Sequence, residues 1–398
     1  MEKKEIDFII CGGGISGLLL ANALNKDSFF KDHHILLIEK ETKNTNDRTL
    51  CCWEQNSGPF DLLLFNKWSM AQFSSDKLKL EFDLSPYNYK MLRSKKFYAQ
   101  YSAELKNNKN ITLIKAKIKN FKSEDNSTIV YTDQGSFISK FVFNSIFNPK
   151  TLYNQKKYPV LQQHFIGWFI NTAKASFDPE KILFMDFDIP QNDLTRFIYV
   201  LPFDSQNALV EYTLFSEHLI NNEDYENGIR EFLSSKRISN YTINEVEQGS
   251  IPMSCFPLEK LNTPSLMHIG TAGGWTKAST GFTFMNTNRQ VSRLVEFLKQ
   301  KKTLNTFKTI SRYRFYDLLF IDVLSKHNGQ GSKLFERMFL KNSPLTIFRF
   351  LDEETTFIEE LKIMSSFTYK QMGWFLKALL NRFFLKFALH QILTKRFQ

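Results

Sequence analysis

A glycine-rich turn near the start of the chain constrains its fold more than any other sequence feature. The turn, residues 12–17, reads GGGISG. It follows an apolar run at 6–11 and precedes a helical pattern at 18–24, and a second apolar run occupies 35–38. Strand, tight turn, helix and strand in this order are typical of a βαβ unit. The sequence therefore predicts an α/β fold that begins with such a unit.

The spacing of the glycines predicts a nucleotide-binding turn. Gly12 permits the sharp bend, Gly14 lets a pyrophosphate approach the backbone, and Gly17 lets the helix pack closely against the strand. Unpaired N–H groups at the helix N-terminus favour a phosphate there. Glu39, at the end of the second strand, is placed to accept hydrogen bonds from an adenosine ribose. We interpret the unit as a dinucleotide site; the alternative is a turn with only a structural role.

Composition and charge exclude several classes of protein. The chain has 398 residues, of which 42% are hydrophobic and 23% charged, which is typical of a globular protein of two or three domains. The net charge is +11, but residues 361–398 contain seven lysines and arginines and no acid, which leaves +4 for the rest. A nearly neutral body does not favour nucleic-acid binding, whereas the basic tail favours a membrane surface or a partner protein.

The four cysteines, Cys11, Cys51, Cys52 and Cys255, form no C-x-x-C pair and no cluster with histidine at zinc-ligand spacing. The sequence therefore predicts neither a disulfide framework nor a metal site, and it favours a reducing cytoplasm. No uncharged run after the first helix approaches the roughly 20 residues of a membrane-spanning helix. If the chain meets a membrane, we expect it to lie on the surface.

The middle of the chain predicts an antiparallel sheet. Strand-like segments cover 164–170, 182–187, 197–203 and 208–214, and the last two flank a polar hairpin loop at 204–207. Their apolar alternation is incomplete, as in a sheet that is covered on both faces. Such a sheet is suited to form one wall of a ligand cavity.

Several longer motifs resemble one known family. In chain order they are NDRTLCCWE at 46–54, YKMLRS at 89–94, QHFIGW at 163–168, RFIYVLPF at 196–203, ALVEYTLF at 208–215 and IGTAGGWTKASTGFTF at 269–284. Together they closely resemble the bacterial lycopene beta-cyclases of carotenoid synthesis, from about residue 6 to about residue 355. Several of these motifs are uncommon outside that family.

The resemblance implies an α/β fold with a glutathione-reductase-like, Rossmann-type FAD-binding domain, an antiparallel-sheet substrate domain and a helical C-terminal region. We expect the FAD-binding domain to comprise residues 1–160 and 265–300, because the chain leaves it and rejoins it near residue 269. The substrate-binding sheet is expected at 161–264. The helical region is expected at 301–398, since apolar residues three and four apart begin near residue 290.

The function that the resemblance implies is an isomerisation. Lycopene beta-cyclases convert the acyclic ψ end groups of lycopene to β-ionone rings, through γ-carotene to β-carotene, with no net redox change. Reduced FAD is the implied cofactor and NAD(P)H the reductant. One alternative is an FAD-dependent monooxygenase or desaturase acting on an apolar isoprenoid, although the segment near residue 270 lacks the Gly-Asp pair of flavin monooxygenases. Another is a non-catalytic carotenoid-binding flavoprotein.

Glu211 is the predicted catalytic acid. It stands in an otherwise apolar strand and corresponds by position to the family's catalytic glutamate. Protonating an alkene requires a carboxylic acid that burial keeps protonated near neutral pH. The alternative is a glutamate on a solvated strand face. Many relatives carry a second acid directly after this glutamate, where this chain has Tyr212, so the base that ends the reaction stays unassigned.

The other predicted site residues come from the same motifs. For the cofactor we predict Gly12, Gly14, Gly17, Glu39, Arg48, Gly270, Gly273 and Gly274. We expect backbone N–H groups of the Gly273–Gly274 turn to hold the flavin phosphate or ring. For the substrate we predict His164, Trp168 and Tyr212, while core packing explains the first two equally well.

The tail, residues 368–397, combines aromatic and basic side chains. They are Trp374, Phe375, Phe383, Phe384 and Phe387 with Lys370, Lys377, Arg382, Lys386, Lys395 and Arg396. This composition predicts an interfacial helix that brings the enzyme to an anionic membrane containing lycopene, on the inner face of the cytoplasmic membrane. Other carotenoid enzymes are expected partners there. The alternative is a terminal helix packed on the core.

Overall fold

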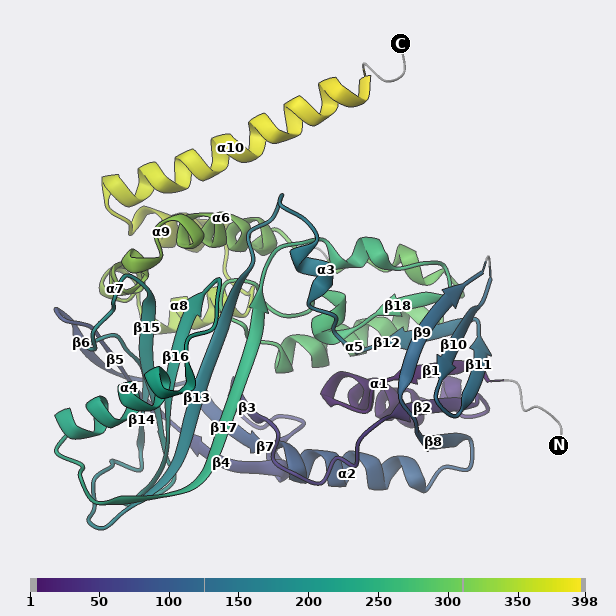
Figure 1. The fold of residues 1–398 in the computed structure, drawn as a ribbon, viewed down its shortest axis with the longest axis horizontal. Coiled ribbons are helices and arrows are strands. Elements are labelled where there is room, and N and C mark those ends of the chain that lie inside the picture. The colour runs from purple at the N-terminus through teal and green to yellow at the C-terminus, as the bar shows by residue number, and fades with distance from the viewer. Residues whose placement is uncertain (1–5, 125, 310, 395–398) are drawn as a thin grey trace.

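The computed structural model describes residues 6–124, 126–309 and 311–394, with side chains described as far as residue 383 in the last helix. Figure 1 shows a parallel sheet with its helices on one side of the molecule and a large mixed sheet on the other. The C-terminal helices lie above the large sheet in this view.

The parallel sheet is the one that the glycine-rich turn predicts. Its strands are hydrogen-bonded in the order β18 (Leu266–His268), β12 (Phe141–Asn144), β1 (Phe8–Cys11), β2 (Ile35–Glu39) and β8 (Ile111–Lys115). All neighbouring pairs are parallel. The strands β1 and β2 are continuous apolar runs, buried almost throughout, which is the pattern of a parallel sheet covered by helices.

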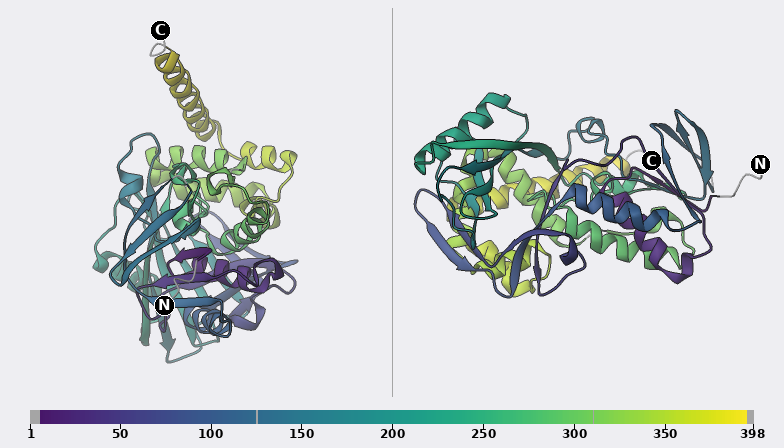
Figure 2. Two further views of the ribbon diagram at one scale, coloured as in Figure 1. Left: turned by 90° about the vertical axis from the view of Figure 1, so that its right-hand side faces the viewer. Right: turned by 90° about the horizontal axis from the view of Figure 1, so that it is seen from below.

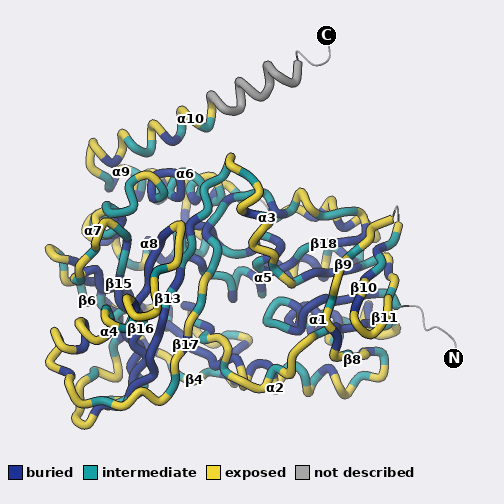
Figure 3. The backbone as a smooth tube through the Cα atoms, in the orientation of Figure 1, coloured by how far each residue is buried: buried dark blue, intermediate teal, exposed yellow. Residues whose placement is uncertain are grey.

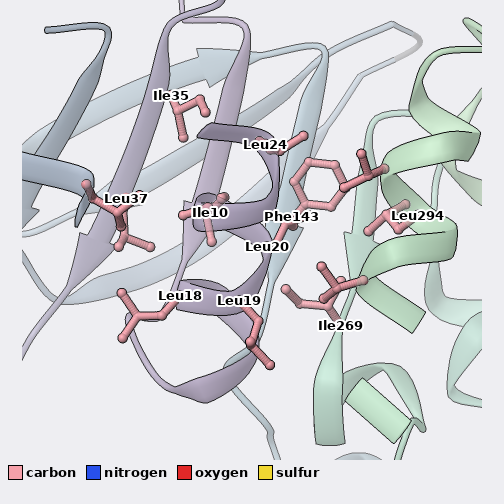
Figure 4. Close-up of a cluster of buried hydrophobic side chains, with 14 of the residues drawn as sticks. Ile10, Leu18, Leu19, Leu20, Leu24, Ile35, Leu37, Phe143, Ile269 and Leu294 are labelled. Atoms are coloured by element: carbon pink, nitrogen blue, oxygen red, sulfur yellow. The ribbon is translucent and has the colours of Figure 1, made fainter. Parts of the chain in front are cut away.

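Three helices cover this sheet. Helix α1 (Ile15–Lys26) connects β1 to β2 and packs beside α2 (Ser94–Lys106) and α5 (Phe284–Leu298). Figure 4 shows leucines of α1, the sheet residue Phe143 and Leu294 of α5 together in one buried cluster. Both β18 and α5 therefore complete a unit that the chain leaves after β12.

Two smaller antiparallel sheets are formed by segments inserted in sequence between strands of the parallel sheet. One has the order β11 (Gly135–Ser139), β10 (Thr128–Thr132) and β9 (Ile118–Ser123). The other has the order β3 (Thr49–Gln55), β7 (Tyr87–Arg93) and β4 (Leu64–Trp68). A short helix, α3 (Lys150–Tyr153), precedes β13 (Leu161–Thr172).

The large sheet has seven strands. Their order is β17 (Tyr241–Met253), β13 (Leu161–Thr172), β16 (Asn207–Ser216), β15 (Thr195–Pro202), β14 (Lys181–Asp186), β5 (Met70–Ser74) and β6 (Lys79–Asp83). Neighbours are antiparallel except β14 and β5, which are parallel. The strands β5 and β6 correct the predicted domain boundary, because they come from the segment assigned to the FAD-binding domain. Pairing between strands so distant in sequence is not visible in local patterns.

The two faces of the large sheet are covered differently. Helix α4 (Asn222–Ser235) packs on one face through Tyr225, Ile229 and Phe232. On the other face, Phe73 of β5 packs against Phe339 of the C-terminal helices, with ring centroids 4.1 Å apart. Figure 3 shows the central strands as largely buried.

The C-terminal region is helical, as predicted. Its helices are α6 (Tyr313–Lys326), α7 (Gly331–Lys341), α8 (Pro344–Leu351), α9 (Phe357–Ser365) and α10 (Tyr369–Thr394). Arg382 of α10 forms an ion pair of 2.5 Å with Asp322 of α6, and Trp374 stacks on His327. Figure 2 shows α10 extending past the body of the molecule. None of the described helices combines the length and hydropathy needed to cross a bilayer.

Candidate active site

One large cavity connects the two main sheets. Its volume is about 580 Å³, and its walls come from the glycine-rich turn, strand β3, the large sheet and the segment before α5. Gly14 of the turn and Glu211 of β16 both line it. The cavity therefore joins the predicted cofactor turn to the predicted catalytic acid.

The glycine-rich turn has the geometry that its sequence predicts. Gly12 adopts a φ of +99°, which favours glycine. A Cβ atom at Gly17 would lie 1.9 Å from the carbonyl oxygen of Gly12, so only glycine allows helix and turn to approach this closely. A Cβ at Gly14 would meet nothing within 4 Å. The start of α1 therefore borders the cavity, with Gly14, Ile15 and Ser16 in its lining.

Glu39 lies against the same turn. Its carboxylate accepts hydrogen bonds from the backbone N–H groups of Gly13, at 2.7 Å, and Glu41, at 2.9 Å. Arg48 belongs to the cavity wall, and its backbone N–H donates to the Ser94 hydroxyl at 3.0 Å. The structure thus places Glu39 against the glycine-rich turn and Arg48 in the wall of the cavity that this turn borders.

The glycines near residue 270 differ from the prediction. They form a 3₁₀ turn, η4 (Gly270–Gly273), and α5 begins only at Phe284. The N–H groups of Gly273 and Gly274 donate within this turn, each at 3.2 Å. The prediction that these N–H groups hold the cofactor is therefore wrong, because backbone carbonyls already accept from them. Thr271 of the turn lines the cavity.

A later part of the same motif, residues 280–284, lines the cavity and was missed as a site. Gly281 has a φ of +73°, and this turn leads directly into the N-terminus of α5. The sequence STGF contained the signal, since glycine before a helical pattern marks a turn. Gly270 has a packing role instead, because a Cβ there would lie 2.0 Å from the Ser16 hydroxyl oxygen.

Glu211 lies in the wall of the cavity, as its proposed chemistry requires. Part of its surface borders the cavity, and protein surrounds the rest. The pKa of Glu211 is raised from 4.5 to about 8, mainly by burial and further by the charge of Glu247. The Thr213 hydroxyl, which donates to the carboxylate at 2.6 Å, offsets part of this rise. At neutral pH the carboxyl group is therefore mostly protonated.

Glu247 of β17 is a second acid in this cavity that the sequence analysis missed. The backbone N–H of Thr49 donates to its carboxylate at 2.7 Å, and the Thr49 hydroxyl donates to the other oxygen. Burial raises the pKa of Glu247 above its usual value, and these two hydrogen bonds and the nearby Arg93 and Arg48 offset only part of that rise. The only sequence signal was a glutamate in a long segment too polar to predict as a buried strand.

The three residues predicted to bind substrate lie on the opposite face of the sheet. Tyr212 pairs with Ile166 across the strands, and the next pair along the strands is Glu211 with Gly167. His164, Trp168 and Tyr212 are buried towards α4, where the His164 ring bonds to the Tyr225 hydroxyl at 2.6 Å. The substrate-binding prediction is therefore wrong for these residues, because side chains alternate between faces along a strand. His164 and Trp168 follow the alternative of core packing, and Tyr212 packs in the same cluster as Trp168.

The fold and the cavity together define an α/β protein with a βαβ unit and a large mixed sheet, and solved structures, among them a protein in complex with FAD, share this fold. A geranylgeranyl bacteriochlorophyll reductase-like protein from Thermoplasma acidophilum is 13% identical, over 94% of this chain and 98% of its own, with a TM-score of 0.63. The halogenase PltM in complex with FAD is 12% identical, over 91% and 86%, with a TM-score of 0.61. A flavoprotein/dehydrogenase from Cytophaga hutchinsonii is 12% identical, over 93% and 100%, with a TM-score of 0.57. The predicted fold class is confirmed.

The chain belongs to the lycopene cyclase family. The sequence model of this family, described as lycopene cyclase protein, matches residues 7–373. The resemblance found in the motifs is thereby confirmed over nearly the whole chain. A comparison with curated protein sequences gave no significant match.

Proposed function

We propose that this protein is an FAD-dependent lycopene beta-cyclase, an isomerase that converts ψ end groups of lycopene to β-ionone rings, through γ-carotene to β-carotene. The observation that carries the proposal is Glu211, a buried carboxyl group in the wall of the cavity that the glycine-rich turn also lines. Family membership supports a carotenoid substrate. Substrate and product are isomers, so the reaction needs an acid and a base but no net electron transfer.

We propose that FAD binds from the glycine-rich turn along the cavity. The first N–H groups of α1 would hold the pyrophosphate, because the start of this helix borders the cavity. Glu39 would hold the adenosine ribose, and Arg48 and Thr283 border the cavity further along. The FAD complex of a halogenase with this fold supports the assignment. Bound FAD, once reduced by NAD(P)H, would supply electron density that stabilises a nearby cation.

The reaction begins with proton transfer from Glu211 to the terminal double bond of the ψ end group. The carboxyl O–H bond breaks, a C–H bond forms, and a tertiary carbocation remains. A neighbouring double bond attacks this cation, closes the ring and moves the positive charge into the ring. An alkene is a very weak base, so the donor must be a protonated acid in a site from which water is largely excluded. The raised pKa of Glu211 meets the first requirement at neutral pH.

Aromatic side chains beside Glu211 are suited to stabilise the cation. Tyr199 pairs directly with Glu211 across the strands, and Tyr89 and Phe165 also line the cavity. The faces of aromatic rings carry negative electrostatic potential and attract cations most strongly where water is excluded. Burial raises the pKa of Tyr89 and Tyr199, so both rings stay neutral phenols.

We propose that the enzyme reaches lycopene on a membrane surface through α10. The exposed side chains of this helix include a stripe at spacings of three and four residues: Tyr369, Met372, Leu376, Leu380 and Phe383. Lys370 and Lys377 are exposed on the same helix, whereas Arg382 is held by Asp322. An apolar stripe with flanking lysines suits an anionic bilayer surface. The predicted tail residues Phe384, Lys386, Phe387, Lys395 and Arg396 lie outside the described side chains.

The experiment that tests this function supplies lycopene in liposomes to the purified protein with chemically reduced FAD in the absence of oxygen. We expect products with β-ionone rings, identified by chromatography and absorption spectra. A product that forms only with oxygen would indicate a monooxygenase. Continuous electron transfer would indicate a desaturase, and pigment binding without conversion would indicate a carotenoid-binding flavoprotein.

A further inference from the structure

Four residues form one row across the central strands of the large sheet. Gly167 of β13 pairs with Glu211 of β16 on one side and with Glu247 of β17 on the other, and Glu211 pairs in turn with Tyr199 of β15. Directly paired residues point their side chains to the same face of a sheet. Glu211, Glu247 and Tyr199 all line the cavity, so this face is the cavity wall.

Gly167 stands between the two glutamates in this row. Two strand spacings of about 4.8 Å each separate the backbones of Glu211 and Glu247. A Cβ atom at Gly167 would lie 2.9 Å from Leu209 Cδ1 and 3.5 Å from the Glu211 Cβ and Cγ atoms. Glycine therefore lets the Leu209 side chain, which lines the cavity, pack over this position, and no side chain of residue 167 stands between Glu211 and Glu247.

The two carboxyl groups have different hydrogen-bond partners. Glu211 accepts from the Thr213 hydroxyl and lies near the phenols of Tyr89 and Tyr199. Glu247 accepts from both the backbone N–H and the hydroxyl of Thr49. A backbone N–H can only donate, so it favours the ionised form of the carboxyl group that it contacts. One acid is thus suited to give a proton and the other to take one.

We propose that Glu247 is the base that ends the reaction, removing the ring proton from the cation that Glu211 creates. This inference rests on the proposed cyclase function. In this step the C–H bond next to the ring cation breaks, its electron pair forms the ring double bond, and the proton passes to a Glu247 carboxylate oxygen. One turnover therefore leaves Glu211 ionised and Glu247 protonated, and proton exchange with solvent restores both. The cavity face that carries both glutamates holds the ring between donor and acceptor.

The position of the base decides which proton leaves, and so which ring forms. The β-ring forms when the proton leaves the ring carbon that made the new C–C bond. Loss of a proton from another carbon next to the cation gives isomers with the double bond elsewhere. Without Glu247 the cation persists until it loses a different proton or captures water. The product distribution therefore reports on Glu247 separately from the rate.

The test compares wild type, Glu247→Gln and Glu245→Gln with reduced FAD and lycopene liposomes in deuterated water. Glu245 is the matched control, because it lies two residues earlier on β17, pairs with Arg93 at 2.5 Å and borders a different cavity. For Glu247→Gln we expect deuterium in the products, a rate at least about 100-fold lower, and a raised share of ring isomers or hydroxylated rings. Glu245→Gln should keep the wild-type product ratio.

Wild-type rate and product ratio in Glu247→Gln would overturn the proposal. If wild type itself forms no rings, the proposed function fails first. Should Glu247→Gln not fold, Thr49→Val provides the second test, because it removes one hydrogen bond to Glu247 and keeps its charge. We expect the acidic limb of the pH–rate profile to move to higher pH in Thr49→Val. An unchanged acidic limb in a folded, FAD-binding variant would equally count against Glu247 as the base.

Discussion

Gly14 and Glu211 line the same cavity, although one belongs to the turn after the first strand of the parallel sheet and the other to the centre of the seven-stranded sheet. A cofactor held at the turn and a substrate held at the large sheet would therefore meet in one cavity. Under the proposed function, this relationship brings a bound cofactor and the acid Glu211 to the same substrate.

The reaction should lose rate as the pH rises through the pKa of Glu211. That pKa is about 8, and only the protonated acid can donate, so the rate should fall about tenfold per pH unit above it. The cyclisation rate measured from about pH 6 to 10 checks this. A flat profile would contradict Glu211 as the donor.

The same group should couple stability to pH. The pKa of Glu211 is raised from 4.5 to about 8, so between these values the folded state holds a proton that the unfolded state has lost. Its contribution to the free energy of unfolding is complete below about pH 4.5 and declines up to about pH 8, by at most about 1.4 kcal/mol per pH unit. Glu211→Gln should therefore gain thermal stability relative to wild type over this range. A stability difference that is the same at pH 5 and pH 8 would contradict this coupling.

Two glycine variants should separate cofactor binding from folding. Gly14→Ala places a methyl group in open space at the cavity, so it should keep the fold and weaken FAD binding at least about tenfold, or 1.4 kcal/mol. Gly17→Ala collides with the Gly12 carbonyl, so it should lower the melting temperature as well. Fluorescence titration with FAD and thermal unfolding measure the two effects. Full FAD affinity in Gly14→Ala would argue against the pyrophosphate site.

Two tyrosines on opposite faces of the sheet should behave differently. Tyr212→Phe removes a hydroxyl that accepts from Arg196 at 3.2 Å, so it should cost about 1 kcal/mol of stability and leave the rate within about twofold. Tyr199→Leu removes a ring beside Glu211, so it should lower the rate at least about tenfold. The cyclisation rates of the two purified variants measure this difference. A large rate loss in Tyr212→Phe would restore that residue to the substrate site.

Membrane binding should depend on the outer stripe of α10. The double variant Leu376→Glu and Leu380→Glu puts charges on exposed positions, so it should weaken flotation with anionic liposomes at least about tenfold without unfolding the protein. The control is Leu62→Glu, which changes a leucine that is 91% exposed outside the C-terminal helices. Equal flotation of the double variant and the control would remove α10 as the anchor.

Local sequence patterns were sufficient for the βαβ unit and for the strand that carries Glu211. The period of two along that strand also contained the position of Tyr212, since neighbours of Glu211 must face the other side. Tyr212 was predicted to bind substrate because it belongs to the same motif as Glu211, although the period of two places it on the other face.

The N–H groups of Gly273 and Gly274 are used within their own turn, a local structure that the glycine-rich pattern did not specify. Two other features depended on tertiary structure and were not visible locally. The pairing of β5 with β14 joins segments that are far apart in sequence. Glu247 becomes part of the site only because β17 pairs with β13, which sets it level with Glu211.

Transfer of solvent hydrogen through Glu211 is the most direct measurement of the central claim. Lycopene is incubated without oxygen in deuterated water with the protein, liposomes and reduced FAD, and the products are analysed by mass spectrometry. We predict one deuterium per ring formed, and for Glu211→Gln a loss of product of at least about 100-fold with FAD still bound. Rings without deuterium, or rings formed by Glu211→Gln at the wild-type rate, would contradict proton donation by Glu211.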